Sequence, residues 1–77
     1  MENFYRRLRD LREDHDLTQE QVAQSLGLKR QQYARYENGQ NDIPTRILIR
    51  LAGFHNTSVD YLLGITNNPK PYRDIEE

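Results

Sequence analysis

Two short helical segments separated by a glycine, within residues 17–39, constrain the fold more than any other part of the chain. The stretch reads LTQEQVAQSLGLKRQQYARYENG. Thr18 and Gln21 have the spacing of a capping box, in which two side chains satisfy backbone N–H groups of a first helical turn. Gly27 stands where that helix must end, because glycine takes a positive φ without steric cost. The pattern predicts one helix over about residues 19–26 and a second over about residues 30–37.

The second of these helices has two different faces. Tyr33 and Tyr36 lie three residues apart, so both can point toward a core. The tyrosines could instead stack on bases, but their helical spacing favours packing in the core with the hydroxyls reaching water. Four side chains of this helix point elsewhere: Arg30, Gln31, Ala34 and Arg35.

Three more helices are expected, and no strand pattern of period two is present. A first helix over about residues 3–15 has Phe4, Leu8 and Leu11 on one face. A fourth follows Pro44, which suits a first helical turn because its missing N–H costs nothing there. Its apolar stripe is formed by Ile47, Leu48, Leu51 and Ala52, with Phe54 adding bulk. The sequence therefore predicts an all-α, compact five-helix domain.

The last predicted helix, over about residues 59–63, is short and marks the end of the folded domain. Ser58 can cap its start, and Gly64 ends it. Residues 66–77 contain two prolines and no periodic apolar spacing. We expect residues 1–65 to form one domain and residues 66–77 to be an extended or disordered tail, with Tyr72 and Ile75 as its only anchors.

Composition excludes several classes of protein. The chain has no cysteine, so it forms no disulfide and no thiolate metal site. It shows no signal peptide and no apolar run that could span a membrane, and a cytoplasmic location is expected. The net charge is −1, but five basic and two acidic side chains give residues 29–50 a local charge of +3. Residues 51–77 carry two basic and four acidic side chains, a balance of −2. This asymmetry predicts that a polyanion such as DNA would bind the middle of the sequence rather than the tail.

The segment resembles the helix-turn-helix of the Cro/phage-repressor (xenobiotic-response-element) family. The similarity rests on LTQEQ at 17–21, Ala23 with Leu26 and Gly27, and YENG at 36–39. It continues through IP at 43–44, Leu48, LA at 51–52 and SVDYLLG at 58–64, and so spans roughly residues 4–65. Lys29 departs from the pattern, because the family often has Ser or Thr capping the second helix; the missing cap costs about 1 kcal/mol. The resemblance implies a lambda-repressor-like fold whose second and third helices form the motif.

The resemblance also implies which side chains read DNA. Helix-turn-helix proteins place the second helix of the motif in the major groove. Arginine suits guanine and glutamine suits adenine, because each forms two hydrogen bonds in one plane. Arg30, Gln31 and Arg35 are the expected base-reading residues, with the Ala34 methyl against a thymine methyl. Gln32 lies on the flank.

Phosphate contacts are expected around the motif. The family pattern gives Gln19 at the start of the first motif helix and Asn38 with Gln40 in the turn after the second. Lys29 and Arg46 are further candidates on charge alone. The same resemblance implies a structural ion pair between Arg12 and Glu37, and a dimer surface near Tyr61, Leu62 and Ile65.

Two charged groups have a simpler interpretation as solvated surface, and two histidines have no expected ligand role. Arg6, Arg7 and Arg9 are expected on a solvated helix face, and so is the acidic patch of Asp10, Glu13, Asp14 and Asp16. His15 and His55 are isolated and forty residues apart, with no nearby ligand set, so a metal site is not expected.

The predicted function is sequence-specific binding of double-stranded DNA by a transcriptional regulator, expected to be a repressor. A homodimer on a palindromic operator is the expected assembly, and no cofactor or small-molecule ligand is expected. The alternative is an antitoxin-like or adaptor module that uses the same fold to bind a protein. An enzyme is the weakest hypothesis, because the chain lacks a cysteine, a histidine cluster and a glycine-rich phosphate loop.

Overall fold

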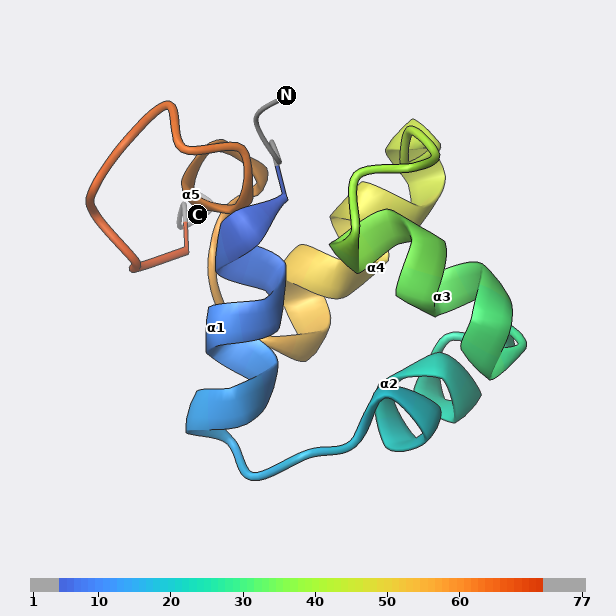
Figure 1. Ribbon diagram of the computed structural model, residues 1–77. Helices are drawn as coiled ribbons and strands as arrows, with labels where there is room; N and C mark the ends of the chain where they lie inside the picture. Colours follow the sequence, from blue (N-terminus) through green and yellow to red (C-terminus); the bar gives the residue numbers. More distant parts are fainter. Residues whose placement is uncertain (1–4, 72–77) are drawn as a thin grey trace.

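The computed structural model describes residues 5–71, which form five helices and, within that range, no strand (Figure 1). The helices are α1 (Arg6–Asp14), α2 (Gln19–Ser25), α3 (Arg30–Glu37), α4 (Thr45–Phe54) and α5 (Val59–Leu62). The all-α, five-helix class predicted from the sequence is confirmed. The predicted bounds of α3 agree with the structure.

The ends of the other helices differ from the predictions by one to a few residues. α1 begins at Arg6 with Tyr5 as its N-cap and ends at Asp14, so it is shorter than expected; Phe4 lies outside the described residues. Pro44 is the N-cap residue of α4 rather than a member of its first turn. Because proline lacks an N–H, either position leaves no donor unpaired.

Side chains define where two of the helices begin. Thr18 accepts a hydrogen bond from the Gln21 backbone N–H at 3.1 Å, and the Gln21 side chain accepts from the Thr18 N–H at 2.8 Å. This is the predicted capping box. Ser58 caps α5 by accepting from the Tyr61 N–H at 3.0 Å. Lys29 precedes α3 without a side-chain cap, as its chemistry requires.

All five helices end in the same way, with a residue of positive φ just past the last turn. After α2, the Gly27 N–H donates to the Gln24 carbonyl and the Leu28 N–H to the Ala23 carbonyl. This Schellman pairing satisfies carbonyls that the last turn leaves free. Gly27 and Gly39 adopt the conformation at φ 72° and 75° without steric cost, and so they end α2 and α3 sharply. After α1 and α4 the position is held by Asp16 and Asn56, at φ 57° and 54°.

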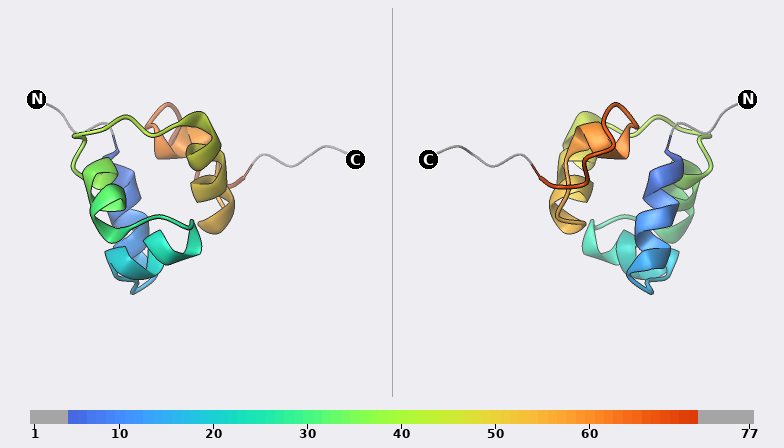
Figure 2. Two further views of the ribbon diagram at one scale, coloured as in Figure 1. Left: turned by 90° about the vertical axis from the view of Figure 1, so that its right-hand side faces the viewer. Right: turned by 90° about the vertical axis from the view of Figure 1, so that its left-hand side faces the viewer.

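The core lies where the five helices meet (Figure 2). α2 packs against α3, α4 against α5, and α1 contacts both α3 and α5. The predicted inward orientation of Tyr33 and Tyr36 is confirmed, because they are 0% and 4% exposed. The other buried apolar residues are Leu8, Val22, Ala23, Leu26, Ile43, Ile47, Leu51, Ala52 and Leu62. Phe54, expected to add bulk to the core, is 39% exposed.

Arg7 holds the segment after α5 against α1, which corrects its expected role as a solvated side chain. Its Nη1 donates to the carbonyls of Tyr61 at 2.9 Å and Thr66 at 2.6 Å, and its Nη2 donates to Asn67 Oδ1 at 2.7 Å. The guanidinium also lies over the Tyr61 ring, 4.1 Å from the ring centroid.

A second contact anchors the same segment. Thr57 Oγ1 donates to the Pro69 carbonyl at 2.6 Å. Residues 66–71 form neither helix nor strand. Hydrogen bonds from Arg7 and Thr57 nevertheless hold them against the domain. The anchors predicted from the sequence, Tyr72 and Ile75, lie outside the described residues. Within the described range no helix is long and apolar enough to span a membrane.

Candidate nucleic-acid interface

The outward face of α3 is centred on Gln31 and Arg35. Successive residues of an α-helix are about 100° apart, so these two side chains lie one turn apart and opposite the buried side of the helix. The buried side is formed by Tyr33, Tyr36 and Glu37. Gln31 and Arg35 are exposed and line a surface hollow of about 520 Å³ together with Lys29, Gln32 and Asn41. Long donor side chains therefore surround one polar depression.

The other expected base-reading residues lie at the edges of this face. Arg30 is exposed but does not line the hollow, and Ala34 is half-buried. Gln32, placed on the flank by the sequence, does line the hollow; its Nε2 lies 3.5 Å from the Tyr36 hydroxyl. The structure thus groups Gln31, Gln32 and Arg35 around the hollow, whereas Arg30 lies outside it.

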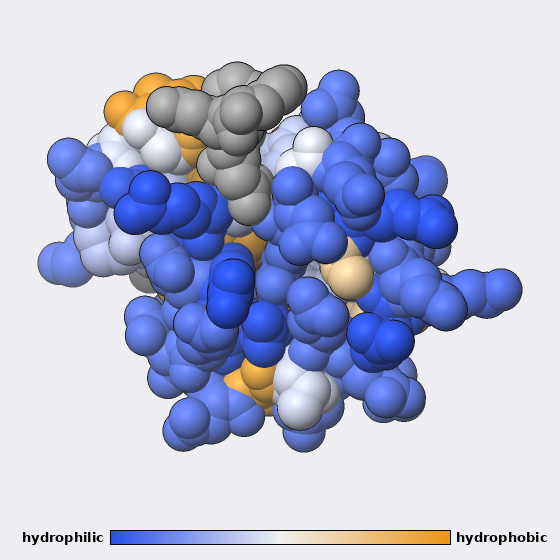
Figure 3. Space-filling view, in the orientation of Figure 1, coloured by the Kyte–Doolittle hydropathy of each residue, from blue (hydrophilic) through white to orange (hydrophobic). Residues whose placement is uncertain are grey.

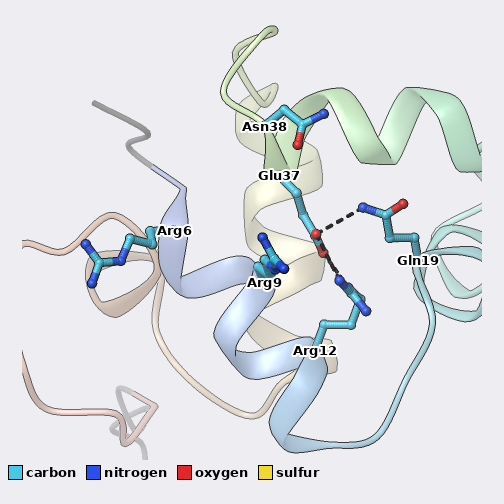
Figure 4. A pocket seen from close by; sticks show the side chains of 6 residues that line it. All are labelled: Arg6, Arg9, Arg12, Gln19, Glu37 and Asn38. Atoms are coloured by element: carbon cyan, nitrogen blue, oxygen red, sulfur yellow. Dashed lines mark hydrogen bonds and ion pairs between the residues drawn. The ribbon is translucent and has the colours of Figure 1, made fainter. Parts of the chain in front are cut away.

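A buried carboxylate fixes α3 to α1 and α2 (Figure 4). Glu37 is 3% exposed. Its Oε2 accepts from Arg12 Nε and from the Tyr33 hydroxyl, each at 2.6 Å. Its Oε1 accepts from Arg12 Nη2 at 3.2 Å and from Gln19 Nε2 at 3.1 Å. Arg12 also donates from Nη1 to the Leu17 carbonyl at 2.9 Å. The ion pair between Arg12 and Glu37 therefore belongs to a network with donors from three helices or their caps.

This network keeps the carboxylate charged. Burial acts to raise the pKa of Glu37, but the hydrogen bonds from Arg12, Tyr33 and Gln19 outweigh it and lower the pKa below its ordinary value. The hydrogen bond to Glu37 raises the pKa of Arg12. Burial, together with the hydrogen bond to Glu37, raises the pKa of the Tyr33 hydroxyl. All three groups stay in their ordinary charge states at neutral pH, and their hydrogen bonds anchor α3 to α1 and α2.

The expected phosphate-contacting residues are spread over several elements. Gln19 is half-buried and uses one amide N–H for Glu37, which leaves its second N–H available. Asn38, directly after α3, is exposed and lines a second cavity together with Gln19. Gln40 is exposed, and its backbone N–H donates to the Arg35 carbonyl at 2.9 Å. Lys29 lines the α3 hollow, and Arg46 is exposed on α4.

The second cavity adds two residues that sequence reasoning assigned to solvated surface. Its volume is about 450 Å³, and Arg6 and Arg9 of α1 line it beside Arg12. The three arginines are spaced three residues apart, which keeps them on neighbouring parts of one helix face. This spacing is the one feature of the sequence that could have indicated a basic cluster here. Nothing in the sequence indicates that Gln19 and Asn38 line the same cavity.

The three expected dimer residues have different environments. Ile65 is 69% exposed. Tyr61 is half-buried beneath the Arg7 guanidinium. Leu62 is 2% exposed and belongs to the core of its own chain, so its side chain is not accessible to a second subunit.

His15 and His55 are not isolated, contrary to the expectation from their separation in sequence. They are the C-cap residues of α1 and α4, and their Nδ1 atoms lie 3.3 Å apart. One Nδ1 must donate and the other accept. Among the described residues, no group of three or more side chains is placed to bind a metal ion.

Comparison with known proteins agrees with the geometry. A family model described as helix-turn-helix matches residues 8–62. The uncharacterized HTH-type transcriptional regulator YobD of Bacillus subtilis is 41% identical over 68 residues, which cover 88% of this chain and 61% of YobD. The regulator YqaE of the same organism is 34% identical over 71 residues, covering 92% of this chain and 61% of YqaE. Antitoxin PezA of Streptococcus pneumoniae is 32% identical over 69 residues, covering 90% of this chain and 44% of PezA.

The chain spans about three fifths of the length of the two Bacillus relatives. No solved structure matches it significantly. The family model nevertheless covers most of the chain, including α2, α3 and the turn between them. The chain therefore belongs to the Cro/phage-repressor type of helix-turn-helix family.

Proposed function

We propose that this domain binds double-stranded DNA sequence-specifically, with α3 in the major groove, and represses transcription by occupying its operator. The observation that carries the proposal is the division of α3 into two faces. One face is fixed to the core through Tyr33, Tyr36 and Glu37, while Gln31 and Arg35 stand in solvent on the other. A rigid helix with exposed bidentate donors can match base edges at low entropic cost.

The roles of individual residues follow from these positions. Gln31 and Arg35 read bases at the centre of the contact, and Arg30 and Ala34 extend it along one side of α3. Gln32 extends it on the other side. Gln19, Asn38 and Gln40 bind phosphates and set the register, with Lys29 and Arg46 adding positive charge.

Selection from a pool of randomised duplexes, repeated at two salt concentrations, tests the proposal. The wild-type protein should enrich one sequence, and its affinity should fall as salt rises, because each phosphate contact displaces counterions. Arg35→Ala and Gln31→Ala should each relax preference at one base pair, at a cost of about 1–3 kcal/mol in discrimination. Arg50→Ala, an exposed arginine of α4 outside both cavities, is the matched control. If both α3 variants kept the base preferences of the wild type at every position, α3 would not be the helix that reads the bases.

A homodimer on a palindrome is part of the proposal. One small domain covers little of a duplex, and two-fold pairing would double the contact. The exposed Ile65 side chain supports a contact next to α5. Light scattering on the wild type and on Ile65→Asp tests this: the mass should fall from dimer to monomer, and a monomeric wild type at all concentrations would contradict it.

Protein binding is the second candidate function. It is supported by the similarity to PezA, which is named as an antitoxin, and by the exposed side chains of Ile49 and Ile65, 60% and 69% exposed. Absence of any sequence enrichment, even at low salt, would favour this candidate over the first.

A further inference from the structure

The cavity between α1, the start of α2 and the end of α3 has the composition of an anion site. Its lining consists of Arg6, Arg9, Arg12, Gln19, Glu37 and Asn38 (Figure 4). Three guanidinium groups and one carboxylate give this lining a formal charge of +2. The surface in the view of Figure 3 is mostly hydrophilic, with a few separate apolar patches. An apolar ligand would find little to contact here, whereas an oxyanion would find donors on several sides.

The positive charge is not distributed evenly within the cavity. Arg12 is committed to Glu37, so this pair contributes almost no net charge. Arg9 pairs with Glu13 at 3.1 Å, but both side chains are more than half exposed, and exposed ion pairs of this kind stabilise little. The Arg6 side chain makes no hydrogen bond or ion pair within the described part of the chain. Arg6 and Arg9 can therefore take an external anion at small cost.

The position of the cavity ties these arginines to the phosphate contacts proposed above. Gln19 and Asn38 line the same cavity. In Figure 4, Gln19 lies to one side of the Glu37 carboxylate and Arg9 to the other, Asn38 lies above it, and Arg6 lies further along α1 with its side chain directed outward. A DNA strand that reaches Gln19 and Asn38 would continue past α1 within reach of the two arginines.

We propose that Arg6 and Arg9 bind the phosphates that follow those held by Gln19 and Asn38, so that α1 extends the DNA contact beyond the helix-turn-helix. This inference rests on the proposed function. Arg12 acts as a positioning residue: by neutralising Glu37, it removes a charge that would repel the backbone and holds Gln19 in place. Such contacts carry no sequence information, so they raise affinity for every duplex by the same factor.

Salt-dependent binding to a mixed-sequence duplex of about two helical turns tests the proposal. The logarithm of affinity falls with the logarithm of salt by about 0.9 per phosphate contact. The slope of the double variant Arg6→Gln/Arg9→Gln should be shallower than that of the wild type by about 1.8. Its base preferences, measured by selection, should stay unchanged.

Two further variants sharpen the test. Arg50→Gln/Lys70→Gln removes the same charge from exposed positions outside both cavities and should keep the wild-type slope. Glu13→Gln frees Arg9 and should strengthen binding at low salt. Circular dichroism checks that each variant is folded.

The outcomes separate this inference from the function on which it rests. If the wild type binds no duplex, the proposed function fails. If the wild type binds with a sequence preference but the arginine double variant has the wild-type slope, only the role of α1 is overturned. The same holds if the Arg50/Lys70 variant loses as much slope as the Arg6/Arg9 variant, because net charge would then explain the effect.

Discussion

Two polar clusters, each built around one buried side chain, connect α1 to the rest of the domain, and they are built in opposite ways. At the first, Glu37 receives hydrogen bonds from Arg12, Tyr33 and Gln19 and keeps its charge. At the second, His55 is 5% exposed and has only the His15 ring as a polar partner among the described hydrogen bonds, while its Nε2 is buried without one. The first cluster satisfies a buried charge, whereas the second keeps the buried His55 neutral at pH 7.

The comparison shows how surroundings choose the charge state of a buried group. Donors outweigh the cost of burial at Glu37, but burial and the nearby His15 lower the pKa of His55 to about 4. The neutral tautomer with the proton on His55 Nδ1 fits best, because it leaves a bare lone pair at Nε2 rather than a buried, unpaired N–H. We therefore expect the free energy of unfolding to depend on pH mainly through His55, and to depend strongly on Arg12 as the partner of Glu37.

Removal of Arg12 should have the largest effect. Arg12→Ala leaves the Glu37 carboxylate buried without its main partner, and we expect a loss of about 3–5 kcal/mol in the free energy of unfolding. Urea denaturation measures it. Arg9→Ala, which breaks only an exposed pair, should change stability by less than about 1 kcal/mol. The double variant Arg12→Met/Glu37→Leu should recover much of the loss, and a cost below about 1 kcal/mol for Arg12→Ala alone would show that the carboxylate finds water.

Acid should act mainly on the histidine cluster. The unfolded chain takes a proton at His55 below its ordinary pKa of 6.5, whereas the folded chain resists protonation down to about 4. Stability is thus fully present above pH 6.5 and falls as the pH drops from 6.5 to about 4, by about 3 kcal/mol. Because the pKa of Glu37 is lowered, that carboxylate contributes stability above its ordinary pKa of 4.5 and loses it only at lower pH.

Urea denaturation at a series of pH values distinguishes these two groups. His55→Leu should flatten the profile between pH 6.5 and 4, since the titrating group is gone. His15→Gln keeps His55 and should keep most of the slope. A wild type as flat as His55→Leu in this range would contradict the assignment.

The smallest effects are expected directly after the two histidines, where Asp16 and Asn56 hold positive φ. Asp16→Gly and Asn56→Gly relieve a conformation that L-residues rarely adopt, and each should stabilise by about 0.5–1 kcal/mol. Asp16→Gly should gain more, because it also removes a negative charge from the negative end of α1. Gly64→Ala is the opposite control: its Cβ would meet no atom within 4 Å, so its destabilisation would come from the backbone at φ 80° alone. Thermal unfolding compares the three, and a gain at Gly64 would contradict the argument.

Local chemistry made much of the architecture predictable. The capping box at Thr18, the cap at Ser58 and the breaks at Gly27 and Gly64 involve residues at most five apart, so the sequence alone placed these helix ends. The inward face of α3 followed from the spacing of Tyr33 and Tyr36 for the same reason. The family pattern also indicated the pair of Arg12 and Glu37, which periodicity alone would not have found.

Only the tertiary structure decided which distant side chains meet. His15 contacts His55, and Arg7 donates hydrogen bonds to Tyr61, Thr66 and Asn67. Arg6 and Arg9 line one cavity together with Gln19 and Asn38. The sequence does not reveal whether a charged or imidazole side chain is solvated or paired with a partner in the fold. Helix start, helix end and helix face are fixed by neighbours along the chain, whereas charge state and contact surface depend on how the helices pack.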